Sequence, residues 1–184
     1  MASSNIIETP RLLIRLDTAV DYIRFVKEYD DATLKQYFGW DDTLLAAGKE
    51  KVNGGLHTYR TSVMFAHFIE KSTGTIIGDF AFHNWFPMHN RAEIGYGMRN
   101  DTFKNKGFMK EAIKPLIDYG FEQMSLNRME AFVSPNNIAS QKIVQSVGFK
   151  QEGFLKEHFC YNDIIDDSIV YGLLRKDYLS NMAE

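Results

Sequence analysis

The chain of 184 residues contains only one cysteine, Cys160, so it cannot form an intrachain disulfide. A protein without disulfides fits a reducing compartment. Its most prominent apolar run, VMFAHFI at residues 63–69, is far shorter than the roughly 20 residues that a membrane-spanning helix needs. The first ten residues lack the charged and then apolar pattern of a secretion signal. We therefore expect a soluble cytoplasmic protein with no membrane partner.

An excess of positive charge is also missing, because 21 lysines and arginines face 24 aspartates and glutamates and leave a net charge of −3. Nucleic-acid-binding domains usually carry a basic patch or stripe, so we expect no direct nucleic-acid partner. Metal-ligand spacing is absent from the histidines at positions 57, 67, 83, 89 and 158. We therefore expect no metal site.

The sequence shows no sign of a covalent nucleophile either. Ser140 has no evident partnership with a histidine and an aspartate, and Cys160 has no special local setting. Because nucleophilic catalysis needs such an activating partner, we expect no covalent acyl-enzyme.

What the chain does contain is material for one well-packed core. Hydrophobic residues make up 45% of the sequence and aromatic residues 14%, and the length suits a single domain over residues 1–184. The spacing of apolar residues predicts, in order, a strand at 11–16, helices within 18–55, strands at 62–70, 75–84 and 91–99, a helix at 108–124, a strand at 128–133, a helix after 137, and strands at 149–157 and 166–174.

The unit from residue 91 to residue 133 determines how the sheet is connected. A strand, a helix and a second strand follow one another there, and such a unit crosses over to place its two strands side by side and parallel. Pro115 lies inside the helix and is expected to kink it. The sequence thus predicts an α+β domain with a mixed sheet of seven strands flanked by helices.

The strand RAEIGYGM carries the first candidate catalytic residue. Alternation places Glu93, Gly95 and Gly97 on one face of this strand, which leaves open space beside a carboxylate. Glycines inside a strand often mark the close approach of a ligand or of other backbone. The alternative is a solvent-facing glutamate at the edge of a sheet.

The segment DTFKNKGFMKEA at 101–112 follows this strand and precedes the crossover helix. A helix start offers unpaired N–H groups and the positive end of the helix dipole, which together favour a phosphate group. Gly107 allows close approach of the backbone, and Lys104, Lys106 and Lys110 add positive charge. On its own the segment is typical of a plain solvated loop, but its position between strand and helix favours an anion cradle.

A third polar group opens the next helix. Asn136 or Asn137 precedes this helix, Ser140 lies in its first turn, and Gly148 follows its end. Plain helix capping explains the pattern. The alternative is that the first turn presents hydrogen-bonding groups to a cleft.

Taken in order, these segments resemble the GNAT acyl-CoA N-acetyltransferases, and within them the RimJ/RimL-like branch typified by ribosomal-protein N-terminal acetyltransferases. The likeness covers nearly the whole chain. It rests on ETPRLLIR at 8–15, AEIGYGM at 92–98, NKGFMKEA at 105–112, NNIASQKIVQSVGFKQEGFLKE at 136–157 and YGLLRKDYL at 171–179. The separate motifs are modest, whereas their order and spacing together are specific.

The resemblance implies acetyl-CoA as the cosubstrate and a V-shaped splay between the fourth and fifth strands, in which the pantetheine arm lies. Met98 and Arg99 would contact pantetheine through their backbone. The implied phosphate-binding and further cofactor contacts are Lys104, Asn105, Lys106, Gly107, Phe108, Met109, Lys110, Asn137 and Ser140. Two of these depart from the family pattern, since Lys104 replaces the usual Gln or Arg and Met109 stands where Gly or Ala is common.

The resemblance also implies direct transfer of an acetyl group to a primary amine, on a protein N-terminus or on a small molecule. Glu93 is the candidate general base, directly or through a water, and Ser140 is the candidate proton donor to the departing thiolate. Val144 occupies the position where many family members carry a tyrosine acid. The alternative is a catalytically silent module that binds acyl-CoA. A monomer and a homodimer both fit the resemblance.

The acceptor pocket is expected among residues 18–60, 84–91 and 158–165. Several aromatic and acidic residues there suit a cationic amine, namely Tyr37, Phe38, Trp40, Asp41, Asp42, Tyr161 and Asp163. Such residues are also common on any protein surface, so the identity of the acceptor stays open.

Overall fold

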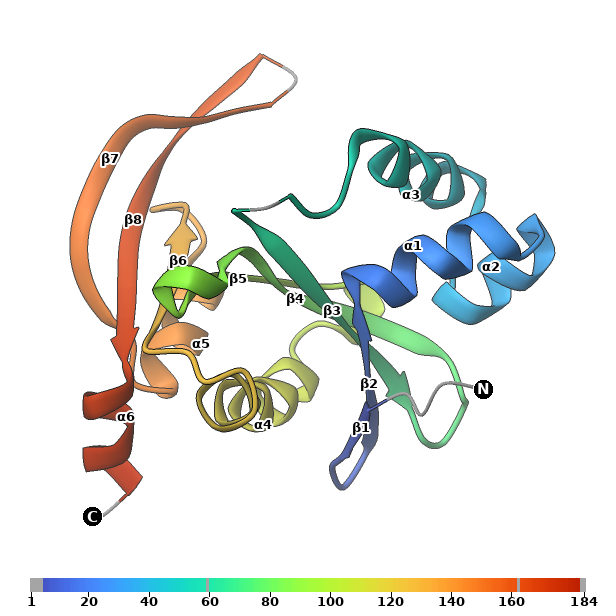
Figure 1. Ribbon diagram of the computed structural model, residues 1–184. Coiled ribbons are helices and arrows are strands. Elements are labelled where there is room, and N and C mark those ends of the chain that lie inside the picture. Colours follow the sequence, from blue (N-terminus) through green and yellow to red (C-terminus); the bar gives the residue numbers. More distant parts are fainter. Residues whose placement is uncertain (1–4, 59, 162, 183–184) are drawn as a thin grey trace.

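The computed structural model describes residues 5–58, 60–161 and 163–182, and its centre is a mixed eight-stranded sheet with helices on both faces (Figure 1). The strands are β1 (Asn5–Glu8), β2 (Leu12–Thr18), β3 (Ser62–Glu70), β4 (Ile76–Phe86), β5 (Arg91–Met98), β6 (Arg128–Val133), β7 (Lys150–Tyr161) and β8 (Ile164–Leu174). The helices are α1 (Ala19–Glu28), α2 (Asp31–Phe38), α3 (Asp42–Gly54), α4 (Phe108–Glu122), α5 (Ile138–Ser146) and α6 (Arg175–Met182). Short 3₁₀ turns at Pro87–His89 and Asp101–Phe103 flank β5.

The strands follow one another across the sheet in the order β1-β2-β3-β4-β5-β6-β8-β7. β5 and β6 run parallel with α4 as their crossover, which confirms the predicted mixed sheet. The structure has one strand more than the predicted seven, because β1 pairs with β2 from Asn5 opposite Leu16 to Glu8 opposite Leu13. A strand of four residues is too short to show alternation, so only its pairing reveals it.

β5 and β6 separate soon after they begin. Their parallel pairing joins residues 91–93 of β5 to residues 128–130 of β6, and no further pair follows in the described part of the chain. Beyond that point β5 stays paired with β4 up to Met98, and β6 stays paired with β8 up to Val133. The two strands therefore splay, as the family resemblance implied for the fourth and fifth of seven strands.

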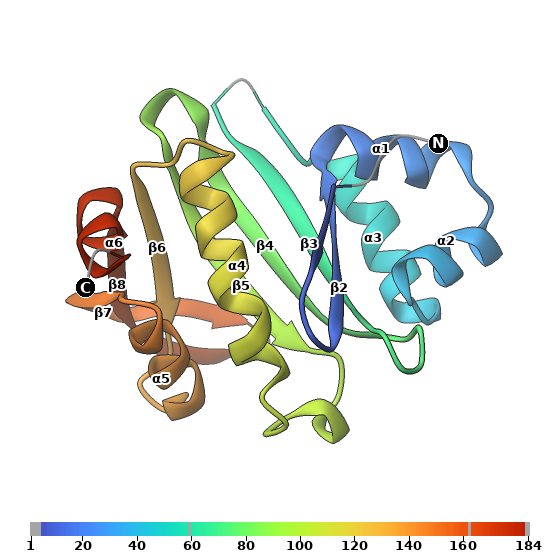
Figure 2. The ribbon, with the colours of Figure 1, turned by 90° about the horizontal axis from the view of Figure 1, so that it is seen from below.

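The main core lies between the sheet and α4 (Figure 2). This helix buries apolar residues at helical spacing, as its sequence pattern predicted, among them Ala112, Ile113, Leu116 and Ile117. Pro115 lies within the helix, which continues as one element to Glu122. The firm packing of α4 fixes the position of its first turn, which faces the candidate site.

The opposite face of the sheet carries a second, aromatic core beneath α1, α2 and α3 (Figure 1). The ring of Phe38 stacks on that of Trp40 at 4.4 Å between centroids, and Tyr22 contacts Phe65 of β3 at 4.7 Å. This packing holds Trp40 close to the sheet. Within the described ranges, no helix is long and apolar enough to cross a membrane.

Candidate active site

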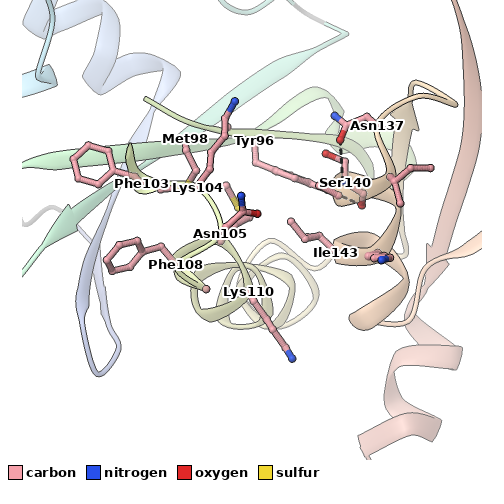
Figure 3. Close-up of a pocket in the computed structure, with 16 residues that line it drawn as sticks. Tyr96, Met98, Phe103, Lys104, Asn105, Phe108, Lys110, Asn137, Ser140 and Ile143 are labelled. Carbon is pink, nitrogen blue, oxygen red and sulfur yellow. Dashed lines mark hydrogen bonds between the residues drawn. The ribbon is translucent and has the colours of Figure 1, made fainter. Parts of the chain in front are cut away.

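A cavity of about 750 Å³ lies where β5 and β6 have separated. The end of β5, the segment before and into α4, and the start of α5 surround it (Figure 3). Its lining residues are Tyr96, Gly97, Met98, Phe103, Lys104, Asn105, Gly107, Phe108, Met109, Lys110, Asn137, Ile138, Ala139, Ser140, Lys142 and Ile143. The volume is within the range of sites for small molecules and cofactors.

The segment before α4 offers backbone groups to this cavity. Gly107 has a φ of +79° and is the N-cap of α4, with no side-chain hydrogen bond to the helix. Asn105, two residues earlier, also has a positive φ of +59°. Left-handed backbone of this kind favours glycine. Because no side chain caps the helix, the N–H groups of its first turn can donate to an anion.

An ion pair outside the cavity holds this segment in place. Nε of Arg11, in the turn between β1 and β2, lies 2.6 Å from Oε2 of Glu111, and its Nη1 donates to the carbonyl of Lys106 at 3.0 Å. Thr9 donates to the same carboxylate at 2.7 Å. Burial raises the pKa of Glu111, but the hydrogen bonds from Thr9 and Arg11 outweigh it and keep the pKa below its usual value. Sequence reasoning missed this contact, because its partners are 100 residues apart.

The start of α5 forms the opposite wall. Asn137 is the N-cap, and its Oδ1 accepts the backbone N–H of Ser140 at 3.0 Å. The carbonyl of Ser140 accepts from the hydroxyl of Tyr96 at 3.2 Å, so a β5 side chain bridges the opening to α5 (Figure 3). Burial raises the pKa of Tyr96, which keeps its hydroxyl protonated. Sequence reasoning did not single out Tyr96, although its position between Gly95 and Gly97 was a signal that could have pointed to it.

Most of the predicted cofactor residues line this cavity: Met98, Lys104, Asn105, Gly107, Phe108, Met109, Lys110, Asn137 and Ser140. Arg99 and Lys106 are not among the lining residues. The backbone N–H of Arg99 donates to the carbonyl of Ile77 at 2.9 Å, and its side chain pairs with Asp79. The structure therefore brings the segment before α4, the first turn of α4 and the start of α5 around one cavity. The side chain of Arg99 points away from this cavity, toward Asp79.

The two positions that depart from the family pattern differ in exposure. Nζ of Lys104 lies 2.6 Å from a carboxylate oxygen of Asp101, and both side chains are exposed. Met109 is only 8% exposed and belongs to the main core. The Met109 side chain thus supports the fold as well as the wall of the cavity.

Glu93 lies on the other face of β5. It does not line the 750 Å³ cavity, and it does not line a second, smaller cavity that lies next to β5. Asn84 donates to its Oε2 at 2.8 Å, and Nε2 of His83 is 3.5 Å from its Oε1. His83 is also the cross-strand partner of Glu93. The ring of His83 covers Gly95, where an added Cβ would lie 2.9 Å from Nε2 of the histidine. The carboxylate is held at one end of a glycine-rich stretch of sheet.

The smaller cavity, of about 300 Å³, lies on this face of the sheet. Ala81 and Gly95, which are cross-strand partners, form part of its floor. Tyr96 and Gly97 line both cavities, so the two meet at β5. The other lining residues are Tyr22, Trp40, Leu44, Lys51, Phe65, His67, Asp79, Phe80 and Arg99. A group held at β5 in one cavity is therefore within reach of a molecule in the other.

Of the residues expected around the acceptor, Trp40 lines this cavity. Asp41 instead caps α3 and accepts the backbone N–H of Leu44 at 2.8 Å, and Asp42 lies 2.6 Å from Nζ of Lys35. The side chain of Tyr161 lies outside the described residues. For metals, the described part of the chain contains no group of three or more His, Cys, Asp or Glu that could hold an ion.

A family model described as an acetyltransferase (GNAT) domain matches residues 11–150. An N-acetyltransferase of Bacillus licheniformis, p20, is 38% identical over 110 residues, which are 60% of this chain and 61% of p20, so the chain spans about three fifths of that relative. The N-acetyltransferase YoaA of Bacillus subtilis is 28% identical over 173 residues, which are 92% of this chain and 97% of YoaA. A spermidine N(1)-acetyltransferase of Escherichia coli is 28% identical over 93 residues, 50% of each chain.

Solved structures share the fold over nearly the full length. The spermidine/spermine N-acetyltransferase SpeG from Vibrio cholerae has a TM-score of 0.67 at 19% identity and covers 93% of this chain and 97% of its own. The ribosomal L7/L12 α-N-protein acetyltransferase RimL has a TM-score of 0.67 at 18% identity, with coverage of 93% and 94%. The ribosomal-protein-S5-alanine acetyltransferase from Vibrio fischeri has 0.65 at 22%, with coverage of 95% and 98%. At such identities the likeness shows the fold.

Proposed function

The chain belongs to the GNAT acetyltransferase family, whose model matches residues 11–150, and on that premise we propose that it is a member of the RimJ/RimL-like branch and transfers the acetyl group of acetyl-CoA to a primary amine. The observation that carries this proposal is the meeting of two cavities at Tyr96 and Gly97. The larger cavity has a helix start suited to phosphate groups, and the smaller one has the small residues Ala81 and Gly95 in its floor. One substrate on each side of β5 can then react at the strand.

Acetyl-CoA fits the larger cavity by charge and by size. The N–H groups of the turn after Gly107 would hold the pyrophosphate, and Lys104, Lys110 and Lys142 add positive charge around the same cavity. The pantetheine arm would lie along Met98, with the thioester near Tyr96. Because backbone groups make most of these contacts, the departures at Lys104 and Met109 leave them in place.

The acceptor must lose a proton before it can attack. Protein α-amino groups titrate at about 7.7–8 and lysine side chains at about 10.4. Glu93 would take this proton through a water, since its carboxylate lies on the acceptor face of β5 but outside the lining of the smaller cavity. Asn84, which donates to Oε2 at 2.8 Å, orients the carboxylate for that task.

The reaction itself needs no covalent enzyme intermediate. The amine nitrogen attacks the thioester carbonyl carbon, the carbon–sulfur bond breaks, and a proton passes to the sulfur of CoA. Ser140 would donate or share that proton, because it is in the wall of the larger cavity and is held there by Asn137. Tyr96 would position the start of α5 through its bond to the Ser140 carbonyl.

The test measures CoA release with a panel of peptide, amino-sugar, polyamine and drug amines. We expect Glu93→Gln to lower kcat about 100-fold and Ser140→Ala to lower it by about tenfold, while Glu93→Gln keeps the acetyl-CoA affinity of the wild type. Glu50→Gln, at an exposed position of α3, serves as the control and should change neither quantity.

Calorimetry with acetyl-CoA separates this proposal from a catalytically silent acyl-CoA-binding module. Binding without turnover of any amine would support the silent module. A protein that does not bind acetyl-CoA would contradict both functions. Unchanged rates in Glu93→Gln and Ser140→Ala would overturn the residue roles while leaving the transfer reaction standing.

A further inference from the structure

The smaller cavity has an asymmetric set of charges. Among its lining residues are two cations, Lys51 and Arg99, and one carboxylate, Asp79. A cavity built to hold a polycation would need several carboxylates that face it, since each ammonium group gains from an opposite charge close by. The charged residues that line this cavity are mostly positive, which is the opposite of what a polycation would require.

The single carboxylate is already committed to other groups. Oδ1 of Asp79 is 2.7 Å from Nδ1 of His67 and accepts from Nη2 of Arg99 at 2.8 Å. Nε of Arg99 lies 2.5 Å from Oδ2, although its N–H is not aligned with that oxygen and has no hydrogen-bond partner in the described structure. An ammonium group that entered here would compete with both His67 and Arg99 for one carboxylate.

The second cation of the lining, Lys51, is not held by a carboxylate as Arg99 is. Lys51 is in the last turn of α3 and is exposed, and it forms no ion pair with another described residue. Its neighbour Lys49 lies 2.5 Å from Asp31, and Lys35 of α2 lies 2.6 Å from Asp42. Of these three lysines, Lys51 alone lines the cavity, and it has no ion-pair partner among the described residues, so its ammonium group is free to bind a ligand.

Size and wall chemistry limit the ligand further. A volume of about 300 Å³ is at the low end of small-molecule sites, and the aromatic residues Tyr22, Trp40 and Tyr96 are among those that line it. Tyr96 marks the end where the thioester would lie, because it lines both cavities. The amine must therefore point toward Tyr96, and the rest of a small acceptor extends toward α3 and Lys51.

We propose that the acceptor is a small primary amine that also carries a carboxylate, with the amine at β5 and the carboxylate bound by Lys51. This inference rests on the proposed acetyl transfer and deepens it. It separates this chain from proteins of the same fold that are named for spermidine, whose substrate carries positive charge along its length. It also replaces the expectation of a cationic acceptor, because Asp41 and Asp42 are occupied outside the cavity.

The test uses the full-length chain and three acceptors that differ only at one end: 4-aminobutanoate, n-butylamine and 1,4-diaminobutane. With acetyl-CoA, kcat/KM should be about tenfold higher for the carboxylate than for the methyl compound, and lowest for the diamine. Lys51→Glu should lower kcat/KM for 4-aminobutanoate about tenfold and raise it for the diamine. Lys49→Glu makes the same charge change outside the cavity and should leave the order of the three acceptors as it is.

Binding to the protein–CoA complex, measured by calorimetry, gives a readout that does not depend on turnover. Tighter binding of 4-aminobutanoate than of 1,4-diaminobutane, lost in Lys51→Glu and kept in Lys49→Glu, supports the proposal even if no acceptor reacts. In that case the transfer reaction fails and the ligand class stands. A wild-type preference for the diamine, or equal effects of the two lysine variants, overturns the ligand class while acetyl transfer stands.

Discussion

The two cavities that meet at β5 are built in different ways. The larger depends on backbone, through the left-handed Gly107 and the uncapped first turn of α4. The smaller depends on side chains from α1, from α3 and the turn before it, and from three strands. Backbone geometry tolerates most substitutions, whereas a side-chain lining changes with each one. Under the proposed function, a donor cavity built from backbone beside an acceptor cavity built from side chains would let one fold take different acceptors.

The largest effect should come from a substitution that fills the smaller cavity and leaves the larger one unchanged. Ala81→Leu would place three more carbons over the open floor beside Gly95. We expect kcat/KM for the best acceptor to fall about 100-fold, because one methylene group in a pocket changes kcat/KM by about 10- to 200-fold, while the acetyl-CoA affinity stays within about twofold of wild type. Steady-state kinetics and calorimetry measure the two quantities.

Ala46→Leu, at an exposed position of α3, is the matched control and should leave both quantities unchanged. An equal loss of acetyl-CoA affinity in Ala81→Leu would show that the two cavities are not separate in function.

A smaller effect should follow from a change in the backbone of the donor side. Gly107→Ala keeps the chain composition almost unchanged but places a Cβ on a residue with φ of +79°. Left-handed backbone costs an alanine about 1 kcal/mol, so we expect acetyl-CoA to bind about fivefold more weakly. Lys104→Ala should alter the affinity by less than about twofold, since its exposed side chain pairs with Asp101. The reverse ranking, measured by calorimetry, would mean that side chains rather than backbone hold the donor.

The smallest effect concerns the ion pair between Arg11 and Glu111, which holds the segment before α4 in place. Because the pKa of Glu111 is depressed in the folded protein, its ionised form stabilises the fold above the unfolded pKa of about 4.5, and this contribution is lost as the pH falls through the folded value. Glu111→Gln should therefore lower Tm at pH 7, and the difference from wild type should shrink below pH 4.5.

Thermal unfolding at pH 7 and at a pH below 4.5 measures the Tm difference between Glu111→Gln and wild type. Glu122→Gln, at an exposed position of the same helix, should show no such pH dependence. A Tm difference for Glu111→Gln that stays constant with pH would assign the stabilisation to shape rather than to charge.

Local patterns predicted most of the elements. The helical spacing of Ile113, Leu116 and Ile117 predicted α4, and all of these side chains are buried in the structure. The succession of strand, helix and strand predicted the parallel pair β5 and β6. Both predictions succeeded because periodicity and crossover connections depend on residues that are close in the chain. β1 was missed, since its evidence is pairing with another strand.

The site was predicted unevenly for the same reason. The residues of the loop before α4 and the start of α5 were named from short motifs, and the structure gathers most of them around one cavity. The lining of the smaller cavity was predicted only in part, since Trp40 lines it whereas Tyr37 and Phe38 do not. Asp41 and Asp42 looked suited to an amine but serve as a helix cap and an ion pair, while Lys51 and Asp79 gave no local signal.

Local sequence patterns set the order of the elements, the mixed character of the sheet and the start of α4 at Gly107. These properties follow from periodicity and from the conformational preferences of a few residues such as Gly107. Only the tertiary structure decided which side chains share the smaller cavity. Lys51 on α3, Asp79 on β4 and Arg99 beyond β5 are far apart in the chain, and their common environment arises from the packing of α3 over the sheet. The charge that lines the smaller cavity is therefore a property of the fold.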